Sequence, residues 1–155
     1  MKFLEKQIYM VEHLLSYRTR VDSKDLNDML QYSQHSLGIF GLTLSGDIIL
    51  NISELITAEE RQIYGVEILF PVDKAFKSQG QYIYKPMFKL VNAVSTRFYS
   101  SYTRLPEVKE KFYSFMKEHS MQPITDIYYV IRQNINDPSS EKVFDAYIAV
   151  NSNIV

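Results

Sequence analysis

Polar and apolar residues alternate along residues 5–19, which contain neither glycine nor proline. A period of two predicts a long strand. Over residues 23–37 the apolar residues recur every three or four positions instead, which is the spacing of one helical face. Asp22 or Ser23 offers an N-cap for this helix. We expect the helix to end at Gly38, because glycine is the preferred residue after a helix.

Two further strands complete the first half of the chain. The alternating or continuously apolar stretches at 47–52 and 64–72 predict them, and the polar residues 57–62 separate them. The second half has the same order of strand, helix, strand and strand. Its expected elements are strands at 87–99, 127–135 and 143–150, and a helix that starts near Pro106.

Corresponding elements of the two halves lie roughly 80 residues apart, which indicates an internal duplication. We expect one domain, residues 1–155, built from pseudo-repeat halves at about 1–78 and 86–155, with a polar linker at about 73–86. The predicted fold class is α+β. The duplicated strand-helix-strand-strand units would form a mainly antiparallel sheet with two helices on one face and a groove on the other.

Composition removes several classes of function. With 17 basic and 18 acidic residues the net charge is −1, which argues against nucleic acid and anionic membranes as partners. The absence of cysteine removes thiol nucleophiles, and the three histidines have no metal-ligand spacing, so we expect no metal site and no cofactor. Without a long apolar run or a signal peptide, we expect a cytoplasmic monomer or weak homo-oligomer.

Aromatic residues are abundant, with 12 Tyr and 9 Phe. Tyrosine joins an apolar ring to a polar tip, so an excess indicates half-buried clefts or interfaces, although a sheet-rich fold also favours it. Tyr17 and Tyr99 lie near the ends of the two first strands, where they would either sandwich a flat ligand or fill the seam between halves. Tyr128 and Tyr147 are expected on the groove face of their strands.

Two charged residues are expected on the same groove face. Glu67 lies opposite the apolar positions of its strand, where it would bind a donor, pair with Arg132 or act as a general base. Its alternative is a place on a solvated sheet face. Arg132 shares a face with Tyr128, where it would anchor an anion or form an ion pair across strands.

Four short motifs, in this order, resemble the GyrI-like small-molecule-binding superfamily. They are the strand at 65–72 that ends in Pro-Val, Tyr102 with Leu105 before the second helix, the aromatic segment 112–116, and Asn-Asp-Pro at 136–138. The resemblance covers nearly the whole chain. It implies a stand-alone domain that binds a small molecule in its groove. The chain also resembles a smaller bacterial family of this fold that is often encoded beside type VII secretion genes.

The chain departs from that superfamily at two places. Ser100 or Ser101 stands where a glycine is common, and Arg132 stands where relatives that sense cations have a carboxylate. An arginine there repels cations, so the resemblance implies a neutral or anionic aromatic ligand. Our leading hypothesis is therefore non-covalent binding of a small molecule or peptide. The alternatives are a protein partner from a secretion locus, and a hydrolase that uses Glu67.

Overall fold

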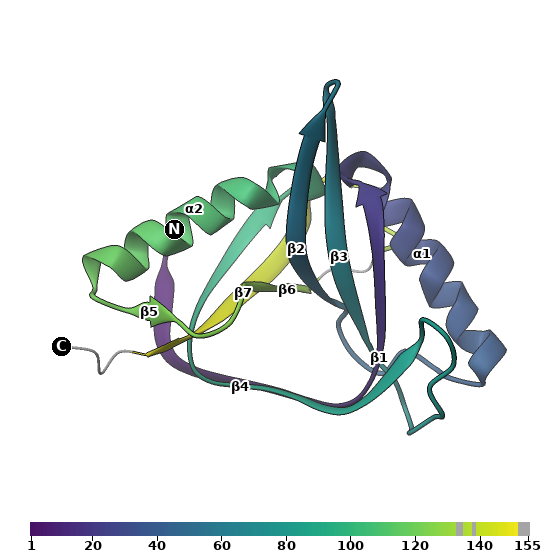
Figure 1. The fold of residues 1–155 in the computed structure, drawn as a ribbon. Coiled ribbons are helices and arrows are strands. Elements are labelled where there is room, and N and C mark those ends of the chain that lie inside the picture. Colours follow the sequence, from purple (N-terminus) through teal and green to yellow (C-terminus); the bar gives the residue numbers. More distant parts are fainter. Residues whose placement is uncertain (133–134, 138, 152–155) are drawn as a thin grey trace.

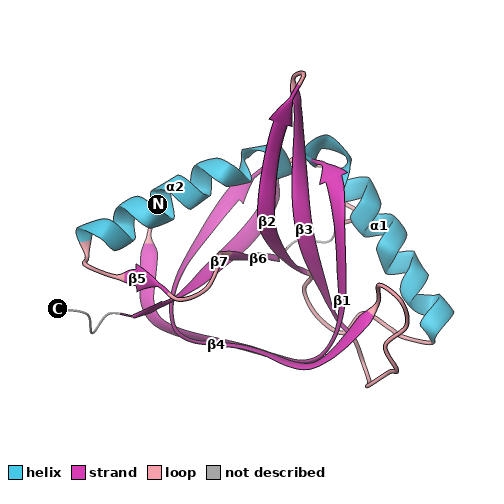
Figure 2. Ribbon diagram, in the orientation of Figure 1, coloured by secondary structure: helices cyan, strands magenta, loops and turns pink. Residues whose placement is uncertain are grey.

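The computed structural model describes residues 1–132, 135–137 and 139–151 (Figure 1). Nine helices and strands follow one another along this part of the chain, with short 3-10 turns before each helix and after the first (Figure 2). They are β1 (Phe3–Asp22), α1 (Leu26–Ser36), β2 (Ile49–Ala58), β3 (Arg61–Pro71), β4 (Ile83–Ser100), α2 (Leu105–Glu118), β5 (Gln122–Pro123), β6 (Tyr128–Ile131) and β7 (Lys142–Asn151).

The strands form one sheet in the order β4-β1-β3-β2-β6-β7-β5, and all seven described ladders are antiparallel. Because β4 also pairs with β7, six of the strands close into a ring. The ladder β1–β3–β2 of the first half is repeated as β4–β7–β6 in the second. The two halves meet where β1 pairs with β4 and where β2 pairs with β6.

The registers define which residues of the two halves are equivalent. Arg18 of β1 lies opposite Glu67 of β3, and Arg97 of β4 lies opposite Asp145 of β7. Glu67 in turn faces Asn51 on β2, while Asp145 faces Val130 on β6. Arg18 and Glu67 are therefore the counterparts of Arg97 and Asp145.

The long strands β1 and β4 each serve two neighbours because they bend. The first part of β1 pairs with β4 and its second part pairs with β3. Register shifts interrupt the β1–β4 ladder, and Lys6, His13 and Asn92 have positive φ angles. Bulges of this kind bend a strand and increase its twist, which lets a two-stranded ribbon turn from one half of the sheet into the other.

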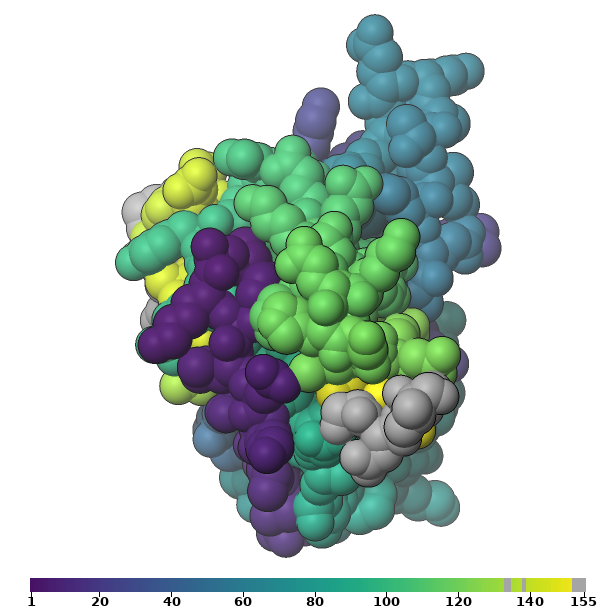
Figure 3. Space-filling model, turned by 90° about the vertical axis from the view of Figure 1, so that its left-hand side faces the viewer, coloured from purple at the N-terminus to yellow at the C-terminus, as the bar shows by residue number. Residues whose placement is uncertain are grey.

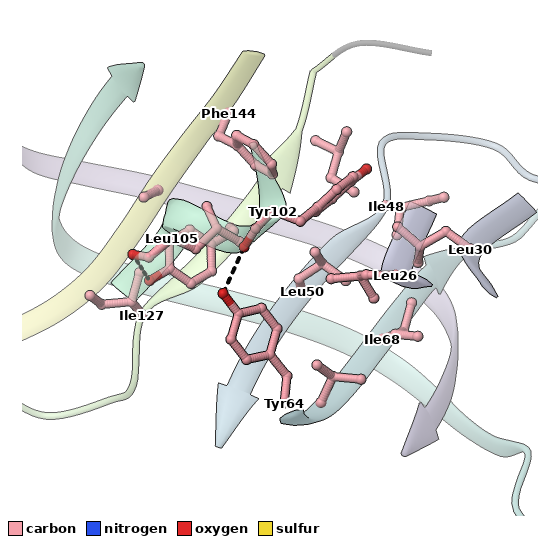
Figure 4. Packing of buried hydrophobic residues seen from close by; sticks show 14 of the residues in the cluster. Leu26, Leu30, Ile48, Leu50, Tyr64, Ile68, Tyr102, Leu105, Ile127 and Phe144 are labelled. Atoms are coloured by element: carbon pink, nitrogen blue, oxygen red, sulfur yellow. Dashed lines mark hydrogen bonds between the residues drawn. The ribbon is translucent and has the colours of Figure 1, made fainter. Parts of the chain in front are cut away.

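Both helices pack on one side of the sheet, where the main hydrophobic core lies (Figure 4). Tyr64 of β3 is completely buried there, and its hydroxyl donates a 2.7 Å hydrogen bond to the carbonyl oxygen of Tyr102, just before α2. Burial raises the pKa of Tyr64, so its hydroxyl stays protonated and keeps donating. This bond ties the second helix to a strand of the first half.

The predicted fold class is confirmed: a mainly antiparallel α+β sheet carries two helices on one face. Several boundaries differ. Gly38 does not end the first helix; a 3-10 turn follows α1, and Gly41, with a φ of 69°, closes it. The linker predicted at 73–86 is shorter, because β4 already begins at Ile83. The strand predicted at 47–52 continues to Ala58.

In the second half, the strand predicted at 127–135 is limited to β6, and β5 was not predicted. The N–H of Arg132 makes one further hydrogen bond of 2.8 Å to the carbonyl oxygen of Val143, and residues 133 and 134 lie outside the described residues. The predicted turn at 136–140 includes Pro138, which lies outside the described residues.

Candidate functional site

The sheet face opposite the main core has its own apolar floor, formed by Leu14, Ile49, Leu69 and Val130. We call it the groove face. Aromatic rings from four strands pack on this floor. Tyr9 and Tyr147 lie 4.9 Å apart, Phe88 and Tyr128 lie 4.7 Å apart, and Tyr9 also meets Phe88 edge-on, all measured between ring centroids. The centre of the groove face is therefore filled by the protein's own side chains.

Glu67 lies beside this aromatic cluster, with its residue surface only 8% exposed. Ser16 Oγ of β1 donates a 2.6 Å hydrogen bond to its Oε2 atom, and Lys85 Nζ of β4 lies 2.9 Å from the same atom. Arg18 Nε approaches Oε2 at 3.4 Å. Alternation along β1 places Ser16 and Arg18 on one face, and the register of β1 with β3 brings that face to Glu67.

All three donors meet the same oxygen. Among the described residues no hydrogen bond reaches Glu67 Oε1, and no buried side-chain nitrogen or oxygen lacks a partner. Oε1 is therefore in contact with solvent. The carboxylate is anchored through one oxygen and presents the other as an acceptor.

Opposing effects set the ionisation of Glu67. Burial disfavours the charged form, but the hydrogen bonds from Ser16 and Lys85 and the positive charges of Lys85 and Arg18 outweigh it. The pKa of Glu67 is consequently below its ordinary value. The neighbouring Tyr128 has a raised pKa, first because of burial and then because of the Glu67 charge. At neutral pH the pair consists of a carboxylate and a neutral phenol.

Two surface hollows meet at Glu67. One, of about 470 Å³, extends towards Asn51, Asp126 and Tyr128, and the other, of about 520 Å³, extends towards Lys85 and Ile83. Both are lined by Arg18 and Glu67. Glu67 thus lines recessed surface that has an aromatic ring, Tyr128, on one side and the cationic group of Lys85 on the other.

Arg132 lies in a separate environment at the second half's end of the groove face. Its guanidinium contacts Asp47 Oδ2 at 2.7 Å and Asp145 Oδ2 at 3.3 Å, so the expected pair with Glu67 does not form. Arg97 holds Asp145 through two hydrogen bonds of 2.8 and 2.9 Å. Arg97 and Arg132 line a hollow of about 580 Å³, but two aspartates already neutralise their charge.

The proposed equivalence of Tyr17 and Tyr99 is wrong. Tyr17 lies opposite Ile68 and stacks on Tyr82, with ring centroids 5.3 Å apart, at the edge of the helix-side core. Tyr99 lies opposite Val143 and is 72% exposed beside Arg97. The two strands are offset by fewer residues than the separation of these tyrosines, so the two rings belong to opposite faces. Tyr128 and Tyr147, by contrast, are direct cross-strand neighbours on the groove face.

Several groups around Glu67 were not predicted. Ser16, Arg18 and Lys85 come from strands whose register with β3 and with each other cannot be read from periodicity. Tyr9 and Phe88 were not predicted either, because the register shifts between Leu4 and Tyr9 and the positive φ of His13 interrupt the simple alternation of β1. The alternation of Ser16 and Arg18 with Tyr17 is the one sequence signal that places both on a common face.

No protein-family model and no curated protein matches this chain. Its fold is similar to that of the EcmrR C-terminal domain, with a TM-score of 0.65 and 15% identity over 97% of this chain and 99% of that one. The EcmrR chain in an EcmrR–DNA complex is also similar to this chain, with a TM-score of 0.71 and 16% identity over 96% of this chain. This chain spans 57% of that EcmrR chain. A conserved protein from Listeria innocua matches with a TM-score of 0.55 and 9% identity, over 95% of this chain and 93% of that one.

These likenesses agree with the GyrI-like fold that the sequence motifs implied. Within the described residues, no group of histidine, aspartate and glutamate side chains is arranged to hold a metal ion. Neither α1 nor α2 is long and apolar enough to cross a membrane.

Proposed function

We propose that this protein binds a small molecule non-covalently at the Glu67 end of the groove face. The observation that carries this proposal is that the two oxygens of the Glu67 carboxylate differ in their hydrogen bonding. Oε2 is fixed by Ser16, Lys85 and Arg18, whereas no hydrogen bond among the described residues reaches Oε1, and Glu67 lines recessed surface together with Tyr128. A preorganised acceptor beside an aromatic wall is the arrangement that orients a ligand in a pocket.

A neutral or anionic aromatic ligand suits the charges of the hollow towards Lys85. There Arg18 and Lys85 exceed the single negative charge of Glu67, so a cationic ligand gains little. In the hollow towards Tyr128, by contrast, three carboxylates face two arginines. A ligand with an N–H or O–H group can donate to Oε1, stack on Tyr128, and place a polar or anionic substituent near Arg18. Arg132 is proposed only as a peripheral group, because Asp47 and Asp145 already occupy its guanidinium.

The fold comparisons and the sequence resemblance support small-molecule binding in general. The chain has the fold of the EcmrR C-terminal domain over nearly its whole length. It does not span the whole EcmrR chain of the DNA complex, so contact with DNA is not part of the proposal. The expectations of no nucleic-acid partner and of a cytoplasmic location remain predictions.

Thermal denaturation against a panel of anionic, neutral and cationic aromatic compounds tests the proposal, because a ligand that binds only the native state raises the melting temperature. We expect shifts with anionic or neutral compounds that Glu67→Gln removes. The matched control is Glu107→Gln, which changes an exposed carboxylate paired with Arg104 and lines neither hollow. Equal shifts in wild type and Glu67→Gln, each measured from its own baseline, would contradict the site assignment.

One observation favours a protein partner as the second candidate. The aromatic cluster of Tyr9, Phe88, Tyr128 and Tyr147 fills the centre of the groove, which leaves ligand space only at its ends. A partner protein, from a secretion locus or elsewhere, would then use the half-buried rings as a contact surface. Absence of any thermal shift together with co-purification of one defined partner would favour this candidate.

The hydrolase hypothesis ranks below both. A carboxylate general base works best with a pKa raised towards neutrality, whereas the pKa of Glu67 is lowered. Turnover of a reactive substrate that Glu67→Gln abolishes would reverse this ranking.

A further inference from the structure

The hairpin formed by β2 and β3 extends beyond the rest of the sheet. Figure 3 shows it as the blue segment that projects above the neighbouring helix. On the inner side β3 continues to pair with β1 as far as Ile63, but β6 pairs only with Ile49–Asn51 of β2. From Ile52 to Ala58, therefore, no described strand covers the outer edge of β2.

This edge presents backbone hydrogen-bonding groups at known positions. Ala58 and Arg61 flank the two-residue turn Glu59–Glu60, whose positive φ angles fit a tight hairpin. The residues that flank such a turn form a hydrogen-bonded pair, and non-hydrogen-bonded and hydrogen-bonded pairs then alternate along the ladder. Leu55 and Thr57 consequently direct their N–H and C=O groups away from β3, towards the open edge.

The edge lacks most of the features that normally protect a strand. It has no proline and no lysine, and its one bulge lies at Ser53, at the start of the open stretch and away from Leu55 and Thr57. Leu55 is 47% exposed and Ile56 is 37% exposed, on alternate faces of the strand. Long edges with exposed apolar residues are templates for pairing with another strand.

A small hollow of about 90 Å³ adjoins the edge and adds side-chain specificity. Leu55 lines it from β2, Pro106 and Tyr113 line it from α2, and Ile127 lines its floor. A strand added to β2 would point every second side chain towards α2, so an aliphatic residue at the correct position would enter this hollow.

Charge identifies the kind of strand that fits. Glu59, Glu60 and Asp126 surround the edge, and no ion pair involves them within residues 1–132, 135–137 and 139–151. Glu54 and Arg61 are paired with Arg20 and Asp22 respectively. Lys109 is the basic residue in the hollow, and it lies over the Tyr113 ring. Acidic charge therefore dominates.

We propose that the open edge of β2 captures an extended, basic peptide segment of another protein by β-strand addition, with one aliphatic side chain in the Leu55–Tyr113 hollow. A second copy of this chain fits less well, because pairing two hairpins would bring two sets of glutamates together. This site adjoins the hollow between Glu67 and Tyr128, because Ser53, Glu54 and Asp126 line both. Neither Thr57 nor Tyr113 lines that hollow and Glu67 does not line the edge hollow, so variants at Thr57 and at Glu67 test the two proposals separately.

Selection of a random seven-residue peptide library on the full chain provides the probes, and selected peptides are then titrated by fluorescence anisotropy. Thr57→Pro removes an outward N–H without removing a ladder hydrogen bond to β3. Thr57→Val is the matched control, because it changes the same side chain and keeps the N–H. We expect selected peptides to alternate Lys or Arg with aliphatic residues, to bind Thr57→Pro about tenfold more weakly, and to bind Thr57→Val normally.

If Thr57→Pro fails to fold, peptides N-methylated at alternate positions test the same backbone contacts on the wild-type chain. Their undiminished binding would contradict strand addition. An empty selection, acidic peptides, or equal binding to both Thr57 variants would each overturn the proposal. Self-association in sedimentation that Thr57→Pro abolishes would show that the edge takes a second copy instead.

Discussion

The two halves place the same ion pair at equivalent positions and surround it differently. In the first half Arg18 lies opposite Glu67, and in the second half Arg97 lies opposite Asp145. Asp145 receives Arg97 on both oxygens and Arg132 on one of them. Glu67 receives every donor on a single oxygen. Equivalent positions of the two halves thus carry the same charges, but of these two carboxylates only that of Glu67 keeps one oxygen without a donor among the described residues.

Neighbouring residues explain the difference. By the register of β2 and β6, the counterpart of Arg132 is Ser53, which carries no charge. The counterpart of Val143 is Gly65, which leaves the first half's hollow open above the strand. A small residue and a neutral residue therefore leave Glu67 accessible, whereas at the Asp145 end a cation occupies the carboxylate and a branched residue lines the hollow.

The largest effect is expected when the second half's branched residue is placed in the first half. A Cβ at Gly65 would lie 2.9 Å from Glu54 Cβ, a distance that side chains do not adopt without movement of the strand. Gly65→Val should lower the free energy of unfolding by about 1–3 kcal/mol. Urea denaturation followed by circular dichroism measures this, and Val143→Gly is the reciprocal control. A stability equal to wild type would show that β2 yields easily at its Ser53 bulge.

The next largest effect is expected from neutralising the two equivalent carboxylates, Glu67 and Asp145. Glu67→Gln weakens the hydrogen bonds of Ser16 and Lys85 in a largely buried place, so we expect a loss of about 1–2 kcal/mol. Asp145→Asn removes the partner of Arg97 and Arg132, but both arginines are already partly exposed to water. We therefore expect a loss of about 1 kcal/mol or less in the free energy of unfolding. Denaturant titrations of both variants provide the comparison. Equal losses would mean that burial of Glu67 adds nothing beyond a surface ion pair.

Acidic pH should lower the free energy of unfolding through the protonation of Glu67. Because the folded pKa of Glu67 lies below its unfolded value, the unfolded chain binds more protons around the ordinary glutamate pKa, and stability rises with pH there. Its contribution is present above that pKa and is lost as the pH falls through the lowered folded value. The stability of Glu67→Gln should depend less steeply on pH below about 4.5 than that of wild type. Parallel curves would contradict the ionised anchor.

Periodicity was sufficient for the order of strand, helix, strand and strand along each half and for the face of Glu67, Tyr128 and Tyr147, because alternation fixes a face without knowledge of neighbours. It failed where two strands had to be aligned. Tyr17 and Tyr99 were paired by counting residues, and the actual ladder offset places them on opposite faces. Lys85 was assigned to a linker, although it reaches Glu67. Registers and bulges depend on tertiary pairing, which a single sequence does not encode locally.

The smallest effect on stability should come with a large effect on binding. Ser53→Arg gives the first half the cation that Arg132 provides in the second, next to the hollow that Glu67 and Tyr128 line. Ser53 is exposed at a bulge, and the variant loses its 3.2 Å hydrogen bond to the carbonyl oxygen of Gly65, so the free energy of unfolding should fall by about 0.5 kcal/mol. The new guanidinium would occupy Glu67 Oε1, as Arg132 occupies Asp145, and thermal shifts with neutral aromatic compounds should disappear. Ser53→Gln, of similar length and without charge, is the control that separates this neutralisation from simple obstruction. If both variants lose the shift equally, the hollow selects by shape and the asymmetry of charge between the halves is not what makes the Glu67 end a binding site.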